Sequence, residues 1–436
     1  MKRFIAIILC ICTLFSLASC ALASITEEQK TEDLNATAEE NKKTEEKKPA
    51  SETQKKYPEV TDKLSWEKIN ALPKATENMT EEELRNVVLA YFELAQTFAW
   101  TPDKGYQYII TTNDKSVTLP SKQVYGGMPY VTNGLGNLYR WMDWYDEETG
   151  VMRLSETSSP KQIGNQCSYG TFWAWSRVCN TLKYFYTSSM TEMNGCIPVG
   201  PYKYDLTKAK FSKDDQTGDV CTANGDQIMF QSYAALKPAD GLVHYSTAGH
   251  VIMCSSVPVI VNNPDGTING EESYITYMDQ GQRWREMEQS NGAKYRVQGG
   301  VHVKSTFNSL LKSGYLPFTI KEFLGTDPVE KAEAKLGIEI GETVTANDLK
   351  AAPLTTNYPI SHVIVTVEDA DGKEIYKYTS YADLGKTMVA SYEYDLSKAI
   401  FPASLSAHAN KGNTIRLKVW VGSGDCLEVV RATLTK

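Results

Sequence analysis

Hydrophobic and polar positions divide the chain into a short apolar start, a polar stretch and a long remainder with the patterns of folded structure. Residues 4–17 are almost wholly apolar and follow two basic residues, Lys2 and Arg3. An apolar run of this length is too short to span a membrane and is typical of a signal-peptide core. Residues 21–57 are rich in Glu, Lys, Thr, Ala and Ser. They offer too little apolar surface to offset the entropy of ordering, so they are predicted to be a disordered linker.

Helical spacing begins at Thr80 in the part that is expected to fold. Thr80 and Glu83 have the spacing of a capping box, which marks a helix start. The apolar side chains that follow recur every three or four residues and are predicted to face the core: Leu84, Val87, Val88, Tyr91, Phe92 and Ala95. Residues 105–119 are predicted to form short strands and turns.

The pattern changes again near Gly325. Residues 326–355 include a charged stretch and are predicted to be a connector. Beyond it, apolar and polar side chains alternate as in strands over four segments, residues 360–368, 374–379, 414–421 and 427–434. Residues 356–436 are therefore predicted to form a small all-β (Ig-like) sandwich. Because 436 residues are too many for one ordinary core, a separate folded domain is expected over residues 58–325.

The end of the apolar start carries a recognisable processing signal. Leu17-Ala18-Ser19-Cys20 resembles the lipobox of bacterial lipoproteins. This resemblance implies a signal peptide over residues 1–19 and a Cys20 that receives a lipid anchor. The protein would then be exported and held at the outer face of the cytoplasmic membrane or in the cell envelope. An ordinary secretory signal, cut at a nearby small residue, is the alternative.

Charge and cysteine spacing exclude several classes of function. The formal net charge is −8 and no basic stripe is present, so nucleic acid is not an expected partner. Six cysteines follow Cys20 without CxxC pairs or metal-ligand spacing, and neither a metal nor a cofactor is expected: Cys167, Cys179, Cys196, Cys221, Cys254 and Cys426.

One of these cysteines has the position of a nucleophile. Asn165 is a candidate N-cap, and Cys167 would then lie in the first turn of a helix whose apolar stripe runs through Phe172, Trp175, Cys179, Leu182 and Tyr186. Free N–H groups and the helix dipole stabilise a thiolate in a first turn. A buried structural cysteine is the alternative interpretation of Cys167.

A cysteine hydrolase needs a base, and histidine is the usual one. His250 follows a small residue, Gly249, and opens the apolar strand of residues 251–257. His244 is the fallback base. The chain has three further histidines, which lack these features: His302, His362 and His408.

A third residue would fix the orientation of the imidazole. Asn263-Pro264-Asp265-Gly266 is a strong turn sequence, and a hairpin centred on it places Asp279 directly opposite His250. Because residues 269–272 offer a second turn that would move the register, Gln280 is the alternative orienting residue.

These segments resemble the NlpC/P60 and CHAP peptidases. In that family a cysteine at a helix start is followed along the chain by a strand that begins with histidine. The same order is found here, in Gln166-Cys167-Ser168 and Gly249-His250-Val251. The segment that precedes the nucleophile in the family is similar to Tyr125-Gly126-Gly127-Met128-Pro129-Tyr130. The similarity covers roughly residues 125–283. Gln166 replaces the family's usual Asp, Tyr169 replaces its usual Gly, and residues 187–226 are an insertion.

The resemblance implies an α+β papain-like (NlpC/P60-like) catalytic domain. Cys167 would be the nucleophile, His250 the base and Asp279 the orienting residue, while Tyr130, Gln166 and Ser168 would contact substrate. The implied reaction is hydrolysis of a peptide or amide bond in peptidoglycan. Three alternatives stay open: an inactive papain-like module that binds wall peptide or a protein partner, a structural lipoprotein, and a glycosidase with paired carboxylates.

Overall fold

The structure is a computed structural model. It describes residues 57–109, 116–132, 134, 136–155, 163–179, 186–325, 333–381, 393–396, 402–410 and 412–435. The predicted signal peptide, Cys20 and almost all of the predicted linker lie outside the described residues. Thr53–Lys436 forms one compact unit. None of the helices in these ranges is both long enough and apolar enough to cross a lipid bilayer.

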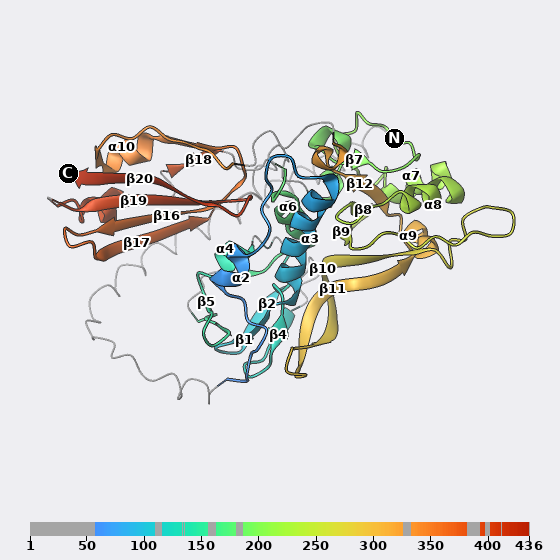
Figure 1. Ribbon diagram of the computed structural model, residues 1–436, viewed down its shortest axis with the longest axis horizontal. Helices are drawn as coiled ribbons and strands as arrows, with labels where there is room; N and C mark the ends of the chain where they lie inside the picture. Colours follow the sequence, from blue (N-terminus) through green and yellow to red (C-terminus); the bar gives the residue numbers. More distant parts are fainter. Residues whose placement is uncertain are drawn as a thin grey trace, which may run out of the picture. The chain divides into compact units, whose positions relative to one another are not determined.

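A ten-stranded mixed sheet organises the first part of the unit (Figure 1). Its strand order is β5-β6-β1-β4-β11-β10-β9-β8-β12-β7. The strands are β1 (Ala99–Pro102), β4 (Tyr125–Gly126), β5 (Tyr145–Asp146), β6 (Val151–Met152), β7 (Ile197–Pro198), β8 (Gly241–Tyr245), β9 (Gly249–Cys254), β10 (Tyr274–Glu288), β11 (Lys294–Thr306) and β12 (Leu316–Thr319). The long hairpin of β10 and β11 lies in the middle of this order, so it joins the two halves of the sheet.

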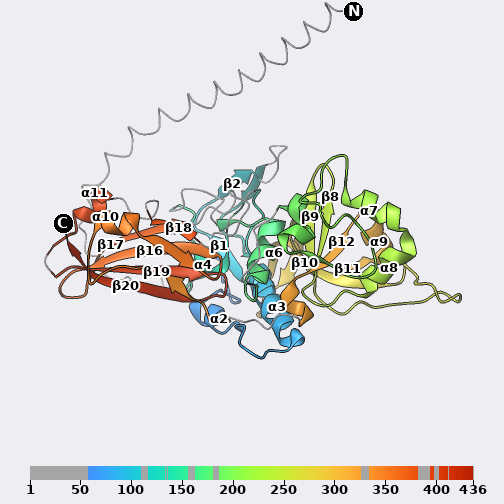
Figure 2. The same ribbon diagram turned by 90° about the horizontal axis from the view of Figure 1, so that it is seen from above.

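Two buried helices pack on this sheet. The predicted capping box is confirmed at the start of α3 (Glu81–Thr97), where Thr80 N donates to Glu83 Oε2 at 2.7 Å and Glu83 N donates to Thr80 Oγ1 at 3.2 Å. The nine-residue helix α6 (Cys167–Trp175) lies beside β9 and β10 in both views (Figures 1 and 2). Every residue of α6 is buried, which explains why it has no polar face.

Shorter elements surround this core. The helices are α2 (Trp66–Asn70), α4 (Leu138–Trp141), α7 (Thr217–Asn224), α8 (Asp226–Ala234) and α9 (Phe307–Lys312), with 3-10 turns η1 (Thr187–Ser189), η2 (Glu192–Asn194) and η3 (Lys321–Leu324). The predicted short strands near residue 110 are β2 (Tyr106–Ile109) and β3 (Ser116–Leu119), which form a separate hairpin.

All four strands predicted near the C-terminus are confirmed. They are β16 (Ile360–Glu368), β17 (Glu374–Tyr381), β19 (Thr414–Val421) and β20 (Cys426–Thr435). The sheet order is β14-β20-β19-β16-β17, and a second sheet has the order β13-β15-β18. Its strands are β13 (Leu336–Gly337), β15 (Pro353–Thr356) and β18 (Glu393–Asp395), and two short helices accompany them, α10 (Ala346–Ala351) and α11 (Pro402–Ser406). The Ig-like type of this region stays a prediction.

Part of the predicted connector belongs to these sheets. β14 (Thr343–Thr345) pairs in parallel with β20, and β13 and β15 lie in the three-stranded sheet. Describing the whole of residues 326–355 as a connector was therefore wrong. The charged residues around these short strands concealed them, because strands of two to four residues carry only one or two buried side chains, such as Val344 and Leu354.

The C-terminal sheets are in direct contact with the N-terminal part of the unit. Trp420 stacks between Trp66 and Tyr139, with ring centroids 5.0 Å apart in both pairs. Below this stack, Asn137 Nδ2 donates to Ser361 Oγ at 2.8 Å, and the fully buried Arg140 donates to the Ser361 carbonyl. Side chains from both parts belong to one continuous hydrophobic cluster, so the two parts share a core.

Candidate catalytic site

Cys167 is the first residue of α6, as predicted from the sequence. The N-cap is Gln166 and not Asn165, and its side chain makes no capping hydrogen bond. Asn165 instead accepts a hydrogen bond from Gln166 N through its own Oδ1 at 2.8 Å. First-turn N–H groups have no acceptor within their helix, so Cys167 lies where an anion is stabilised.

The helix ends earlier than the apolar stripe predicts. α6 stops at Trp175, and the chain turns over residues 176–178. Phe172 and Trp175 are fully buried as expected, while Leu182 lies outside the described residues. Ser176 Oγ donates to the carbonyl of Phe172 at 2.7 Å, and such a bond competes with regular helix continuation.

The segment before the cysteine is tied to the Tyr130 segment. Asn165 N donates to the Pro129 carbonyl at 2.9 Å, and Val131 N donates to the Asn165 carbonyl at 2.8 Å. This parallel bridge holds Tyr130 against the start of α6. The two sequence segments that suggested a family resemblance, 37 positions apart from Tyr130 to Cys167, are therefore neighbours in space.

His250 lies at the beginning of β9, which confirms the predicted strand start. The strand pairs with β8 on one side and β10 on the other. Gly249 permits a close approach, as its small size suggested, because a Cβ at this position would overlap the side chain of Thr187. Because His250 stands at the end of β9, its side chain lies at the rim of the sheet, where it contacts Asp279.

Asp279 accepts a hydrogen bond from His250 Nε2 at 2.7 Å through Oδ2. The predicted direct opposition was wrong by two residues, since Met278 pairs with Met253 and the register therefore sets Asp279 against Ile252. The predicted turn is present, with Gly266 N donating to the Asn263 carbonyl at 2.9 Å. A shift of two residues leaves a side chain on the same face of a sheet, so the pair still meets diagonally.

Three glycines lie close to Asp279, two at its carboxylate and one at its backbone carbonyl. β10 is irregular on both sides of Asp279. A Cβ at Gly300 would lie 2.7 Å from Oδ1, and one at Gly281 would overlap Oδ2, the atom that accepts from His250. Gly299 has φ +99° and packs on the Asp279 carbonyl, so a side chain there would be strained as well as crowded. The carboxylate of Asp279 therefore occupies space that is open because Gly281 and Gly300 have no Cβ.

The electrostatics of the site favour a protonated imidazole. Burial opposes a charge on His250, but hydrogen bonds to Asp279 and Cys167, with the negative charges on both, raise its pKa to about 10. Because Nε2 is engaged by Asp279, Nδ1 is the ring nitrogen that faces the thiol. Cys167, His250 and Asp279 therefore form a connected series of the three groups that the sequence singled out.

A cavity of about 510 Å³ opens beside this series. His250, Asp279 and Tyr130 line it, and so does Tyr315, which follows Gly314 at the start of β12. Gln166 and Ser168, also predicted to contact substrate, are 8% and 2% exposed and are absent from the lining. Both residues are buried.

The alternative orienting residue and the fallback base have other surroundings. Gln280 is fully buried, donates to the Met128 carbonyl at 2.6 Å and accepts from Gln96, so it faces away from the imidazole. His244 pairs with His250 across β8 and β9 and lies beside the Tyr315 ring. Burial lowers the pKa of His244, and its ring nitrogen Nε2 is 3.4 Å from Ser246 Oγ.

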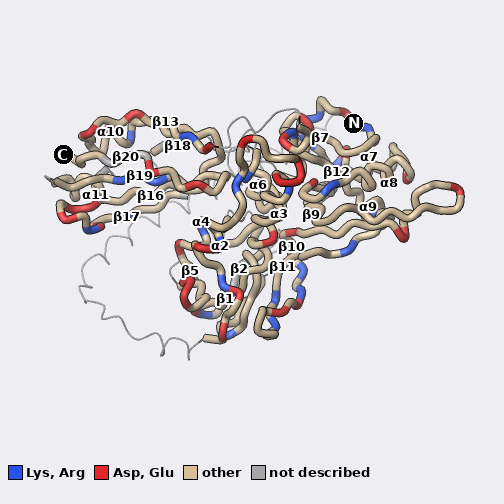
Figure 3. The backbone as a smooth tube through the Cα atoms, in the orientation of Figure 1, with Lys and Arg blue, Asp and Glu red and all other residues tan. Residues whose placement is uncertain are grey.

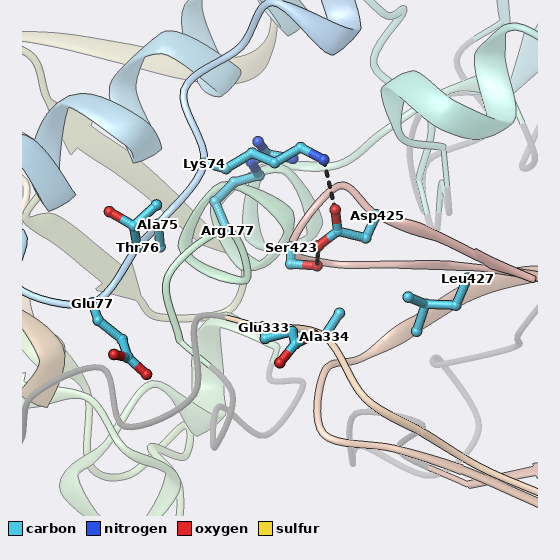
Figure 4. Close-up of a pocket in the computed structure, with 10 residues that line it drawn as sticks. All are labelled: Lys74, Ala75, Thr76, Glu77, Arg177, Glu333, Ala334, Ser423, Asp425 and Leu427. Atoms are coloured by element: carbon cyan, nitrogen blue, oxygen red, sulfur yellow. Dashed lines mark hydrogen bonds and ion pairs between the residues drawn. The ribbon is translucent and has the colours of Figure 1, made fainter.

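A second cavity, of about 470 Å³, lies where the Lys74 segment meets the β19–β20 turn (Figure 4). Its Asp425 is paired with Lys74 at 2.6 Å and accepts from Ser423 at 2.7 Å. Arg177 donates to the Tyr139 hydroxyl and to the Pro73 carbonyl. Because Lys74, Asp425 and Arg177 are engaged by neighbouring residues and no thiol or imidazole lines it, this cavity is a weaker candidate for chemistry than the one beside His250.

Adding one methyl group beside Asp279 is expected to lower the pKa of His250. In the native chain His250 should keep its proton through neutral pH, and the ion pair should stabilise the fold fully below about pH 6.5 and lose that effect as the pH rises toward 10. In Gly281→Ala the methyl group should displace Asp279 Oδ2, and the pKa should fall by more than one unit. NMR titration of the His250 ring measures both values.

Gly218→Ala is the matched control for this change. A Cβ at Gly218 meets no atom within 4 Å, so the same methyl group enters open space in α7. The pKa of His250 in Gly218→Ala should equal its pKa in the native chain. An unchanged His250 pKa in Gly281→Ala, in a chain with native melting behaviour, would show that Asp279 does not control the imidazole.

Several residues of the site have no sequence signal that could have identified them. Arg283 and Arg285 line the cavity from β10, and Tyr315 lines it from the residue before β12; no local motif marks them. Among the described residues, no group of three or more His, Cys, Asp or Glu side chains has the arrangement of a metal site. No family model matches the chain, and no curated protein or solved structure matches it either.

Proposed function

We propose that this protein is a cysteine hydrolase that cleaves a peptide or amide bond. The observation that carries the proposal is the connected series of Cys167, His250 and Asp279, of which His250 and Asp279 line a cavity. A thiol at a helix start, an imidazole within its reach and a carboxylate on the far ring nitrogen are the parts that nucleophilic amide hydrolysis needs.

The proposed reaction has two halves. In the first, the Cys167 sulfur attacks the carbonyl carbon, and His250 passes its Nδ1 proton to the leaving nitrogen as the carbon–nitrogen bond breaks. This leaves a thioester and a neutral imidazole. In the second, His250 takes a proton from water, the hydroxide oxygen attacks the thioester, and the sulfur leaves as the carboxylic acid is released. Asp279 stabilises the imidazolium in each half.

Oxyanion stabilisation would come from the start of α6. The backbone N–H of Cys167 has no acceptor within the helix and lies next to the attacking sulfur. Removal of one such donor from a hydrolase typically costs about 10²–10³ in rate. We assign this donor only, and the second donor is not identified by the geometry.

The proposed substrate is the stem peptide of peptidoglycan. This part of the proposal depends on the resemblance of residues 125–283 to NlpC/P60 and CHAP peptidases and on the lipobox-like segment that ends at Cys20. A lipid anchor and a linker would hold the enzyme in the cell envelope, within reach of the wall. No cofactor is required by the proposed chemistry.

One observation favours the alternative of a binding module without catalysis. Cys167 is 5% exposed and is not among the residues that line the cavity. A substrate carbonyl would have to reach a sulfur that interacts with His250 and Tyr130 but is not part of the cavity lining. The accessibility of this thiol to a small electrophile therefore separates the two functions.

Alkylation of the native chain by iodoacetamide should modify Cys167 first. A thiolate paired with an imidazolium reacts faster than an ordinary thiol below neutral pH. At pH 6 we expect Cys167 to react at least about tenfold faster than Cys426, the exposed cysteine of the described residues. Mass spectrometry of proteolytic fragments gives both rates within one sample.

His250→Ala provides the control for this measurement. Loss of the imidazole should slow alkylation of Cys167 at pH 6 and leave Cys426 unaffected. Reaction of Cys426 ahead of Cys167 in the native chain would favour the binding module.

A further inference from the structure

The cavity beside His250 carries two arginines that the proposed reaction does not use. Arg283 and Arg285 follow Asp279 on β10, and both line the cavity. Asp279 is the single carboxylate among the described lining residues, and its charge is engaged by His250. The imidazolium and the carboxylate compensate each other, so the two guanidinium groups leave the cavity with an excess of positive charge.

The charges of both arginines reach the cavity wall. Burial raises the pKa of the Tyr277 hydroxyl, and Arg285 and Arg283 both act against that rise. Arg283 has the same effect on Tyr315, where burial again raises the pKa. Tyr277 lies on β10 and Tyr315 directly precedes β12, and both line the cavity. The arginine charges therefore act on both of these tyrosines, against the charge of Asp279, which raises the pKa of each.

This positive cavity belongs to an acidic protein. The formal net charge is −8, and acidic positions are spread over the chain while basic positions recur along β10 and β11 (Figure 3). A concave site whose sign differs from that of the whole molecule attracts ligands of the opposite charge. The cavity therefore selects for anionic groups.

The two arginines differ in how they are held. Arg285 Nε donates to the Gly299 carbonyl at 2.9 Å, which anchors its guanidinium beside the bulge that also holds Asp279. Arg283 is exposed and has no hydrogen bond or ion pair with any residue that the structure describes. A fixed guanidinium next to an adaptable one suits a planar carboxylate, which binds guanidinium groups through paired N–H donors.

We propose that Arg283 and Arg285 form a carboxylate subsite, and that the protein takes acidic peptides with a free carboxylate close to the bond at Cys167. This inference rests on the proposed function and names its substrate class. Ser305, Ser309 and Ser313 line the same cavity and supply hydroxyl groups for the remaining polar atoms of such a peptide.

The test compares two peptides on the full chain carrying Cys167→Ala, which binds without turnover. The first probe is L-alanyl-γ-D-glutamyl-L-lysyl-D-alanine, and the second is the same peptide with both carboxylates converted to carboxamides. We expect the acidic peptide to bind about tenfold more tightly, because charge-assisted bonds to arginine are lost in the second. Raising the salt concentration should reduce this ratio. Calorimetry gives both dissociation constants.

Arg283→Gln is the decisive variant, since Arg283 makes no bond on which folding depends. In the Cys167→Ala background it should reduce the preference for the acidic peptide to about twofold or less and leave the binding of the amidated peptide unchanged. Arg285→Lys keeps the charge but loses the planar fork, and should reduce the preference partially.

Arg296→Gln is the matched control. Arg296 lies on β11 and stacks over Trp284 at 4.8 Å, outside the cavity lining. Its loss removes the same charge from the same hairpin and should preserve the preference. Equal binding of the two peptides by Cys167→Ala, absence of binding by either peptide, or an unchanged preference in Arg283→Gln would each overturn the inference.

The outcomes also separate this inference from the proposed function. Tight binding of the acidic peptide with no cleavage by the native chain would retain the subsite and contradict the hydrolase. Equal cleavage of the acidic and amidated peptides would retain the hydrolase and contradict the subsite.

Discussion

Cys167→Ala is expected to abolish the release of peptide fragments from purified peptidoglycan. Without the sulfur no thioester forms, and losing the nucleophile of a connected catalytic series typically costs about 10⁴–10⁶ in rate. The fold should be retained, because alanine fits the small buried position and keeps the helix start. Mass spectrometry of the soluble products, against a digest by the native chain, measures the loss.

Two further variants make this result specific. His250→Ala should cost nearly as much as Cys167→Ala, and the double variant little more, because the residues act as one unit. Cys254→Ala removes another buried thiol, on the same strand as His250, and should preserve activity if the fold is kept. Equal inertness of the native chain and Cys167→Ala would favour the binding module.

Removal of residues 326–436 is expected to unfold the rest of the chain. The truncation uncovers Trp66 and Tyr139, which stack on Trp420, and strips Asn137 and Arg140 of their partner Ser361. A buried polar group without its partner costs about 1–3 kcal/mol. The truncated chain should show no cooperative unfolding transition in urea, whereas the full folded unit should show one.

A single substitution tests the same contact in the whole chain. Trp420→Ala should lower the free energy of unfolding by about 3 kcal/mol, the low end for loss of a large aromatic side chain from a core. Tyr376→Ala is the control, since Tyr376 packs on His408 in the C-terminal region and is not part of the Trp420 stack. Tyr376→Ala should lower the free energy of unfolding by less than Trp420→Ala does. A truncated chain that melts like the full chain would show that the contact is dispensable.

Local chemistry was sufficient to predict much of this molecule. The Thr80 capping box, the start of β9 at the His250 strand and the four C-terminal strands follow from residue types within a few positions of one another. The position of Cys167 at a helix start also follows from residues close to it in the sequence. Each depends on backbone hydrogen bonding and side-chain periodicity, which neighbouring residues determine.

Features that depend on distant contacts were not predictable in this way. β9 and β10 pair two residues away from the predicted register, because the connection between them pairs irregularly, through bridges of Val259 with Tyr274 and of Asn262 with Ile268. The early end of α6 depends on its tertiary surroundings. Arg283 reaches the cavity from β10 and Tyr315 from the residue before β12, so only the assembled sheet reveals them.

The diagonal pairing of His250 with Asp279 has a consequence for the segment that joins their strands. Side chains change sides with every step along a strand, so adding or deleting one residue between positions 255 and 273 would turn Asp279 toward the interior, unless a new bulge absorbed it. Changes of two residues preserve the side. An even change keeps Asp279 on the same face, but a register shift of two residues would still move it along β9 and away from His250. A series of insertions of one, two, three and four glycines, followed by the pKa of His250, would show which lengths keep the contact.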